Sequence, residues 1–244
     1  MRMNTEKTVR ELAVETPHAT RVFEEFGIDY CCSGGRSLRA ACAEKGVLVE
    51  TVERALARGF ASEIERQTQR DWTQCELCSL VDHITATHHV FVRQETVRIQ
   101  QMMAKVAAKH GEKHPEAIRI QEVFCALSAE LTSHLMKEEN ILFPYIVQLE
   151  KAVSSGLPKP RPMFGSVQSP IHMMELEHAS AGEALRSLRE DSHDYTPPED
   201  ACATFQAAYL ALRAFEADLH QHIHLENNIL FPKAIALENS GPAV

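Results

Sequence analysis

Apolar residues recur every three or four positions along most of this chain, and the two-residue alternation typical of strands is nearly absent. This spacing places the apolar side chains on one face of an α-helix. Four long patterns of this kind cover about residues 73–110, 115–153, 167–191 and 196–237. Short connections between long amphipathic helices favour antiparallel neighbours. The sequence therefore predicts an all-α fold whose larger part is an up-down-up-down four-helix bundle.

Residues that begin and end helices support this division. Thr73 and Thr196 each stand three residues before a glutamate, which is the spacing of a capping box. Gly111 interrupts the first long pattern, and Pro115 is placed for the first turn of the second helix. Residues 154–170 are rich in proline and glycine, so we expect an irregular connector between the two halves of the bundle.

A smaller helical unit precedes the bundle. Thr8 and Glu11 have capping-box spacing at the start of a first short helix. Further short helical patterns cover residues 18–26, 37–45 and 49–67. The segment 66–71 is polar and contributes nothing to a core, which is typical of a domain boundary. We expect a small helical N-terminal domain over residues 1–66 and the bundle over residues 73–240.

Composition and charge exclude several classes of protein. Of the 244 residues, 44% are hydrophobic and 24% are charged, as in an ordinary globular protein. The formal net charge of −9 disfavours a nucleic-acid partner, which normally meets a basic surface. No apolar run approaches the roughly 18 residues of a membrane span, and the N-terminus lacks the apolar centre of a secretion signal. Seven cysteines, an odd number, suit reduced thiols in the cytoplasm better than a disulfide framework.

A repeated segment gives the first indication of chemistry. Residues 134–144 return as residues 222–232 with seven of eleven positions identical, in the pattern H-x3-E-x-N-I-L-F-P. In both copies the histidine and the glutamate are four residues apart, so they lie on one helix face. A histidine and a carboxylate on one face, twice over, predict two halves of a metal site.

His89 and His178 stand in register with the repeated segments. His89 precedes His134 by 45 residues, and His178 precedes His222 by 44. The midpoint of each pair falls at or next to a predicted turn, so the two members of a pair lie level in an antiparallel hairpin. Each arm is about 22 residues, or roughly 33 Å. We therefore expect six side chains to meet at one height, namely His89, His134, Glu138, His178, His222 and Glu226.

The residue types in this set point to iron. A single histidine on an apolar face is more often a hydrogen-bonded core residue than a ligand, but the repeat and its register favour ligands. Imidazole and carboxylate suit iron, and paired bridging carboxylates suit two iron ions with a bridging oxo or hydroxo group. Two histidines per iron and two shared carboxylates leave each iron about five-coordinate. Both irons would then keep an open position.

Residues around this set have predicted supporting roles. Glu130 and Asp218 precede the two histidines of the repeats by one helical turn, so both are expected to face inward. Either residue could hold a histidine ring by a hydrogen bond or relay protons. On helical geometry no other histidine faces the site as a fifth histidine ligand. Pro144 and Pro232, six residues after the glutamates, predict a shared kink because proline removes a helical hydrogen bond.

Two adjacent cysteines lie in the N-terminal part, in a segment that reads as a loop. Cys31 and Cys32 follow Asp29 and Tyr30 and precede Ser33-Gly34-Gly35. Such cysteines can be core thiols, a strained disulfide, metal ligands or thiols for exchange. The neighbouring glycines favour exposure and reactivity.

The two motifs together resemble one known family. The paired H-x3-E-x-N-I-L-F-P segments are similar to the haemerythrin-like bundle, and an Asp-Tyr-Cys-Cys-x-Gly-Gly motif before it resembles the Repair of Iron Centres family. The resemblance covers essentially the whole chain. It implies the same six iron ligands, with Glu138 and Glu226 bridging. It also implies that Glu130 and Glu177 lie near the site and its access path, that Cys31 and Cys32 have a thiol or iron-transfer role, and that the protein is a homodimer.

The function that we expect follows from this resemblance. It is the repair of iron–sulfur clusters damaged by nitrosative or oxidative stress, by a cytoplasmic di-iron protein that releases or supplies iron. The partners would be damaged iron–sulfur proteins and nitric oxide, with neither nucleic acid nor membrane. Two alternatives stay open. One is reduction of nitric oxide to nitrous oxide, and the other is a haemerythrin-type sensor or carrier of oxygen or nitric oxide. The carriers use five histidines, which the four found here disfavour. Whether the protein is an enzyme also stays open.

Overall fold

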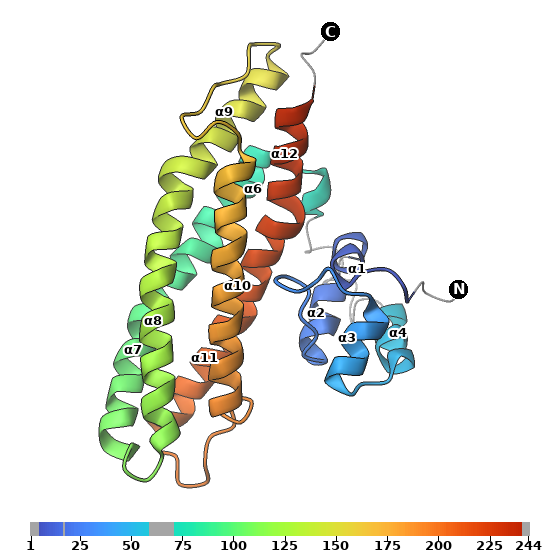
Figure 1. Cartoon of the computed structure of the whole chain (residues 1–244). Helices are drawn as coiled ribbons and strands as arrows, with labels where there is room; N and C mark the ends of the chain where they lie inside the picture. The colour runs from blue at the N-terminus through green and yellow to red at the C-terminus, as the bar shows by residue number, and fades with distance from the viewer. Residues whose placement is uncertain (1–4, 17, 59–70, 241–244) are drawn as a thin grey trace.

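The computed structural model describes residues 5–16, 18–58 and 71–240. Within these ranges all regular elements are helical, and the only strand-like pairing is an isolated antiparallel bridge between Thr8 and Ser37. The prediction of an all-α fold is therefore confirmed. Figure 1 shows the long antiparallel bundle with a smaller group of helices against one side. None of the described helices is long and apolar enough to cross a membrane.

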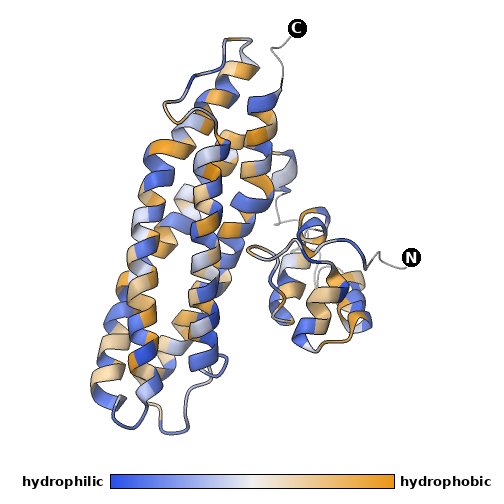
Figure 2. Cartoon of the chain, viewed as in Figure 1, coloured by the Kyte–Doolittle hydropathy of each residue, from blue (hydrophilic) through white to orange (hydrophobic). Residues whose placement is uncertain are grey.

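Four antiparallel rods make up the bundle, and three of them are interrupted by a π-helical turn. The first contains α6 (Leu77–His83), η2 (Ile84–His89) and α7 (Val90–His110). The second contains α8 (Pro115–Lys137), η3 (Glu138–Leu142) and α9 (Phe143–Ser154). The third is α10 (Gln168–Asp191), and the fourth contains α11 (Ala203–Leu225), η4 (Glu226–Leu230) and α12 (Phe231–Asn239). Hydrophobic and polar residues alternate along these helices as an amphipathic pattern requires (Figure 2).

Two predicted capping boxes are wrong, and in both cases the helix begins later. Residues 72–74 form a short 3-10 turn, η1 (Trp72–Gln74), and α6 starts only at Leu77. The carboxylate of Glu150 on α9 accepts the first free N–H groups of α6, so a tertiary contact replaces the local cap. The helix expected at Thr196 begins at Ala203, because consecutive prolines disfavour helical backbone in the residues before them.

The prolines of the two repeats do mark irregular helix. Pro144 and Pro232 each follow a π-helical turn, η3 and η4 respectively. A turn of the same kind, η2, lies on the first rod without a proline. Each π turn adds a residue to the local turn and rotates the side chains that follow it.

The N-terminal helices are short and are held by local caps. They are α1 (Val9–Glu15), α2 (Ala19–Glu25), α3 (Leu38–Lys45) and α4 (Val49–Arg58). The predicted capping box of Thr8 and Glu11 is present, with both reciprocal hydrogen bonds. The predicted continuation of the last helix to residue 67 and the predicted boundary at 66–71 fall largely outside the described residues. The division into domains at that point stays a prediction.

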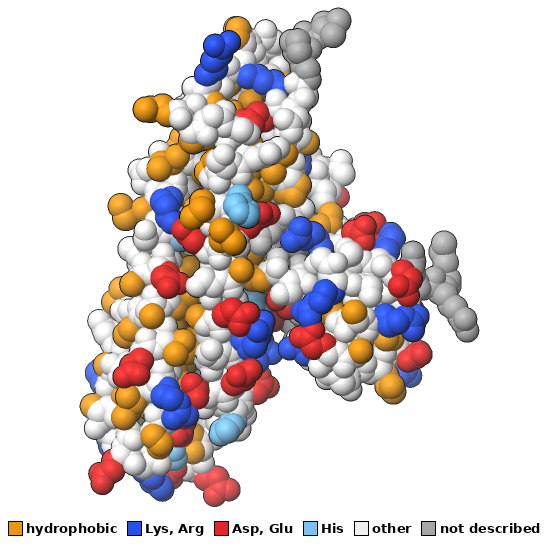
Figure 3. Space-filling view, in the orientation of Figure 1, with side chains coloured by type: hydrophobic (Ala, Val, Ile, Leu, Met, Phe, Trp, Pro, Cys, Tyr) orange, Lys and Arg blue, Asp and Glu red, His pale blue; other side chains and the backbone are white. Residues whose placement is uncertain are grey.

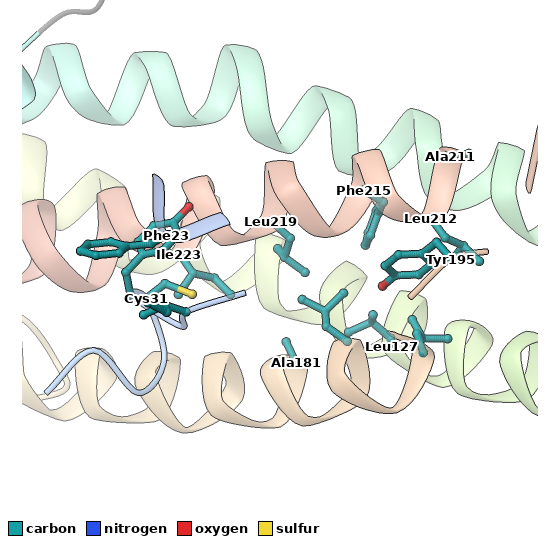
Figure 4. Packing of buried hydrophobic residues seen from close by; sticks show 14 of the residues in the cluster. Phe23, Cys31, Leu127, Ala181, Tyr195, Ala211, Leu212, Phe215, Leu219 and Ile223 are labelled. Carbon is teal, nitrogen blue, oxygen red and sulfur yellow. The ribbon is translucent and has the colours of Figure 1, made fainter. Parts of the chain in front are cut away.

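The N-terminal helices pack against the bundle rather than standing apart. One cluster of buried hydrophobic residues runs from α1–α4 into the half of the bundle that holds the α7–α8 and α10–α11 turns. A second cluster fills the other half, around α6, α9 and α12. In Figure 4 Cys31 from the N-terminal loop appears with Phe23 and with Ile223 of α11. The core thus joins the two parts of the chain close to the histidines and glutamates of the second repeat.

Candidate metal centre

The six side chains expected to meet form two groups of possible ligands. The first group contains His89, Glu138, His222 and Glu226, and the second contains His134, Glu138, His178 and Glu226. Within each group the ligand atoms all lie within 4.8 Å of one another, and every residue is buried. The two carboxylates belong to both groups. Each histidine pair takes one residue from each hairpin, which sequence register alone did not specify.

Helical irregularity helps to place these residues. His89 is the last residue of η2, Glu138 is the first of η3 and Glu226 is the first of η4. The three π turns therefore coincide with three of the six side chains. Local π-helical turns occur often at functional sites, because the added residue turns a side chain toward the interior.

Each glutamate presents one oxygen to each histidine pair. Glu138 Oε1 lies 3.3 Å from His134 Nε2, and its Oε2 lies 3.4 Å from His89 Nε2. Glu226 Oε1 lies 3.0 Å from Nε2 of the histidine four residues before it, and Oε2 lies 3.2 Å from His178 Nε2. This is the arrangement that two carboxylates bridging two metal ions require.

Three of the four histidine rings make a hydrogen bond through the ring nitrogen that faces away from the centre of the site. The Nδ1–H groups of His89, His134 and His178 donate to Glu139 Oε1 at 2.7 Å, Glu177 Oε2 at 2.8 Å and Asn227 Oδ1 at 2.8 Å, respectively. A hydrogen bond of this kind fixes the tautomer and the orientation of the ring. With the proton on Nδ1, each Nε2 directs a lone pair into the centre of the bundle, where it can bind a metal.

The charges of the site balance one another. Burial raises the pKa of Glu226, but His222, His178 and His89 outweigh it and hold that pKa well below the usual value. Burial lowers the pKa of His89, yet the nearby carboxylates of Glu138 and Glu226 raise it to about 10. The carboxylates therefore stay ionised at neutral pH, and metal binding would displace protons from His89 and His134, whose pKa values are raised.

Several atoms of the site fit a cation better than any protein partner. His134 Nε2 and His178 Nε2 lie 3.0 Å apart although both rings are held with Nδ1 as the donor. Among the described residues, His89 Nε2, both oxygens of Glu138 and Glu226 Oε2 are buried without a hydrogen-bond partner. Each such atom costs about 1–3 kcal/mol. Metal ions between the two histidine pairs would give all of these atoms a partner, so the residues present fit a two-metal site.

Comparisons with known proteins agree with this geometry. Residues 5–59 match the model of a domain of unknown function (DUF542), and residues 79–234 match the haemerythrin HHE cation-binding domain. Over 228 residues the chain is 36% identical to proteins named iron-sulfur cluster repair protein YtfE from Escherichia coli O157:H7, Shigella boydii serotype 4 and Citrobacter koseri. The match covers 93% of this chain and 96% of each relative.

The chain belongs to the YtfE family of iron–sulfur cluster repair proteins. The resemblance inferred from its two motifs is therefore confirmed, and so is the haemerythrin-like bundle.

The structure changes the role expected of Glu130 in this YtfE-family chain. Glu130 is exposed on α8 and accepts a hydrogen bond from Ser180 at 3.4 Å, so it does not hold the ring of His134. Glu177, on the neighbouring helix α10, does so instead. Asp218 also differs from expectation, because its Oδ1 lies 3.0 Å from Nδ1 of His88. A spacing of one helical turn does not predict which carboxylate contacts a histidine ring, because that contact depends on how each helix is rotated about its axis.

A pocket of about 370 Å³ between α8 and α10 leads toward the second ligand group. His134 and His178 line it together with Glu130 and Glu177. Lys137 forms an ion pair with Glu177 in the same pocket. Both glutamates thus line this pocket, although only Glu177 contacts a proposed ligand, and their role on an access path stays a prediction.

The cysteine loop lies closer to this site than the sequence implied. Cys31 is buried and Cys32 is partly exposed, with their Sγ atoms 3.6 Å apart and neither in a disulfide. The hydrogen bond with Cys32 and burial raise the pKa of the Cys31 thiol well above its usual value. The expectation of an exposed and reactive pair therefore does not hold for Cys31. Cys32 Sγ donates to the backbone oxygen of His178 at 3.3 Å.

The sequence reasoning missed the residue that follows each bridging glutamate. Glu139 and Asn227 occupy equivalent positions in the two repeats, and each holds the histidine on the preceding helix of its own hairpin, His89 and His178 respectively. The repeat itself could have revealed them, because this position differs between two otherwise similar segments. Asn228, which donates to the backbone oxygen of Tyr30 at 3.0 Å, was also missed. Nothing local predicts a contact with a loop almost 200 residues away.

Proposed function

We propose that this protein holds two iron ions between its two histidine pairs and uses them to repair iron–sulfur clusters damaged by nitrosative or oxidative stress. The observation that carries the proposal is the pair of four-residue ligand groups that share Glu138 and Glu226. Relatives at 36% identity over nearly their full length are named iron–sulfur cluster repair proteins, which supports the same role here. The proposed place of action is the cytoplasm, where all seven cysteines would stay free thiols.

In this proposal His89 and His222 bind one iron, and His134 and His178 bind the other. Glu138 and Glu226 bridge the two, with an oxo or hydroxo group completing the centre. Iron held by these residues would be the cargo that the protein can give to a damaged cluster. The protein groups orient the imidazoles, neutralise the charge of the metal ions and shield the centre from water.

The pocket between α8 and α10 gives the proposed route for iron. It ends at His134 and His178, and its walls carry the carboxylates of Glu130 and Glu177. Carboxylate oxygens can pass a hard cation from one to the next because they bind it without long rearrangement. The Cys31–Cys32 loop contacts His178 from the other side, through the bond from Cys32 Sγ to the His178 backbone oxygen. A thiol or iron-transfer role for the two cysteines is therefore part of the proposal.

The proposed partners are damaged iron–sulfur proteins and nitric oxide. The net charge of −9 continues to disfavour nucleic acid. The homodimer expected from the family resemblance is tested by measuring the mass of the protein in solution.

Cluster recovery in a damaged client tests the proposal. The di-iron protein is added to an iron–sulfur protein whose cluster nitric oxide has disrupted, and the return of the cluster absorption is followed. We expect recovery with the iron-loaded protein and little with a Glu138→Leu, Glu226→Leu double variant of the same helical content. Equal recovery with both proteins would overturn the proposal, because the bound iron would then be dispensable.

Reduction of nitric oxide to nitrous oxide is the second candidate function. Its support is the four-histidine set, which leaves a position open on each of two adjacent irons. The reduced di-iron protein is mixed with nitric oxide in a sealed vessel, and nitrous oxide is measured in the gas phase. Repair without nitrous oxide excludes the second candidate, whereas nitrous oxide without repair would replace the first. Reversible binding of oxygen or nitric oxide without either result would indicate a sensor or carrier.

A further inference from the structure

Asn227 contacts a proposed iron ligand and the cysteine loop at the same time. Its Oδ1 accepts the hydrogen bond from Nδ1 of His178 at 2.8 Å. Its Nδ2 donates to the backbone oxygen of Cys31 at 3.4 Å. The side chain is 4% exposed, so water does not compete for either bond. One amide thus joins the metal site to a loop 196 residues earlier in the chain.

The other repeat has no such connection. Glu139, at the equivalent position, uses one oxygen to hold His89 and the other to pair with Arg93. A carboxylate can only accept hydrogen bonds, so it could not also donate to a backbone carbonyl. An asparagine has an acceptor at one end and donors at the other. An amide at this position can therefore accept a hydrogen bond from His178 Nδ1–H and also donate one to the backbone oxygen of Cys31, whereas an acid can only accept.

Further contacts bring the loop onto the same helical turn. Cys32 Sγ donates to the backbone oxygen of His178, and a Cβ at Gly182 one turn later would lie only 3.2 Å from that sulfur. Gly182 thus leaves the space in which Cys32 sits. Tyr30 is 2% exposed, and its ring packs edge-on against His224 at 5.4 Å between ring centres. The loop is seated on α10 and α11 at the level of the proposed metal ligand.

A metal on Nε2 of His178 fixes the position of the ring, and the Nδ1–H of that ring then has the amide oxygen of Asn227 as its acceptor. The amide Nδ2 then faces the backbone oxygen of Cys31. Without a metal, the ring loses its partner on the Nε2 side, so the ring and the amide that contacts it are placed less firmly.

An amide that is placed less firmly donates less well to the Cys31 backbone oxygen, so loss of the metal disfavours the seated loop. We propose that Asn227 links iron occupancy at His178 to the docking of the Cys31–Cys32 loop. Iron favours the docked loop, and by thermodynamic necessity a client that lifts the loop weakens the hold on iron by the same factor. The inference rests on the ligand set of the proposed function. It adds a way for the protein to release iron when a partner lifts the Cys31–Cys32 loop.

Alkylation of Cys32 measures whether the loop is docked. Full-length protein, iron-loaded and iron-free, is treated with iodoacetamide, and modification of each cysteine is followed by peptide mass spectrometry. We expect iron to slow the alkylation of Cys32 about tenfold, within the range usual for coupled sites. Cys125, which is exposed on α8, serves as the internal reference whose rate should not respond to iron.

Asn227→Asp separates the two bonds of Asn227. An aspartate still accepts from His178, as Glu139 does from His89, but it cannot donate to Cys31. The variant should keep two irons while the Cys32 rate no longer responds to them. Asn227→Leu, which makes neither bond, provides a second variant without a buried charge and should also lose the response. Far-ultraviolet circular dichroism shows whether each variant keeps its helices.

Asn228→Ala is the matched control. It removes the bond to Tyr30 but leaves Asn227 and its two partners in place. The Cys32 rate should rise in both the iron-loaded and the iron-free protein, while the ratio between them stays as in the wild type. An Asn228→Ala variant that lost the ratio as Asn227→Asp does would overturn the specific role of Asn227.

The reverse direction is tested by the loop. Tyr30→Ala removes the ring that seats the loop without removing a proposed ligand, and should speed the loss of iron to a chelator by about the same factor as iron slows alkylation. If the wild type holds no pair of irons, the proposed function fails. If it holds two irons but the Cys32 rate does not respond, or Asn227→Asp still responds, only the linkage fails.

Discussion

The two copies of the repeat carry the same proposed ligands in very different surroundings. In the first copy Asn140 and Ile141 are exposed, and the asparagine amide donates only to its own helix at the Met136 carbonyl oxygen. In the second copy Asn228 and Ile229 are buried. The N-terminal helices cover the second copy, where α1 contacts η4, and leave the first copy open.

The difference teaches that internal duplication preserves the ligands more strictly than their support. The first copy holds a histidine of the facing helix with a carboxylate, and the second does so with an amide that also reaches the cysteine loop. Charged side chains of both signs gather where the N-terminal helices meet the bundle (Figure 3). Glu24 of α2 and His220 of α11 also meet between the two parts, with their Oε1 and Nδ1 atoms 2.8 Å apart. The first copy therefore supplies and supports ligands only. The second copy also forms the contact between the bundle and the cysteine loop.

The largest expected effect tests whether the two copies are equivalent as ligands. Glu138→Leu and Glu226→Leu each remove a proposed bridge, and both variants should bind fewer than two irons per chain. Leucine fills a buried site without an unpaired charge, so we expect the helices to remain. Iron content and the absorption of the bridged centre measure the effect. Glu122→Leu, at an exposed position of α8 outside the pocket, should keep both irons. A bridge variant that retains two irons with unchanged absorption would show the ligand scheme to be wrong.

A smaller effect tests the support of the first copy. Glu139→Gln makes the first copy resemble the second, because a neutral amide replaces the carboxylate behind His89. Loss of such a partner lowers metal affinity by about 10–100-fold. Iron affinity is measured by competition with a chelator. Arg93→Met, which removes the other partner of Glu139 without touching His89, serves as the control and should change affinity far less. Equal affinities for Glu139→Gln and the wild type would show that the carboxylate does not tune the ligand.

The smallest effect contrasts the two asparagines. Asn228→Ala leaves Tyr30 O and His224 Nδ1 without the donor that each has in the structure, and should cost about 1–3 kcal/mol of unfolding free energy. Asn140→Ala removes only a bond at an exposed position, and should change stability by less than about 0.5 kcal/mol. Urea unfolding of the two variants measures both values. Similar losses for both would mean that the burial of the second copy has no energetic consequence.

The sequence by itself determined the all-helical fold, the repeat and the six residues that meet in the bundle. The reason is geometric. Side chains four residues apart share a helix face, and residues at equal distances from a hairpin turn lie level, so register follows from counting. The chain turned where Gly111 and Pro115 predicted. Helix starts were less certain, because α6 is capped by Glu150 from a distant helix rather than by Thr73.

Only the tertiary structure decided how these residues are paired and supported. Which histidine faces which depends on the rotation of each helix about its axis, and the π turns at His89, Glu138 and Glu226 alter that rotation locally. The same rotation brings Glu177 rather than Glu130 behind a ring. The seat of the cysteine loop on α10 and α11 arises from packing between segments far apart in the chain. No local pattern of residues encodes such a contact, so it appears only when the two parts of the chain are folded together.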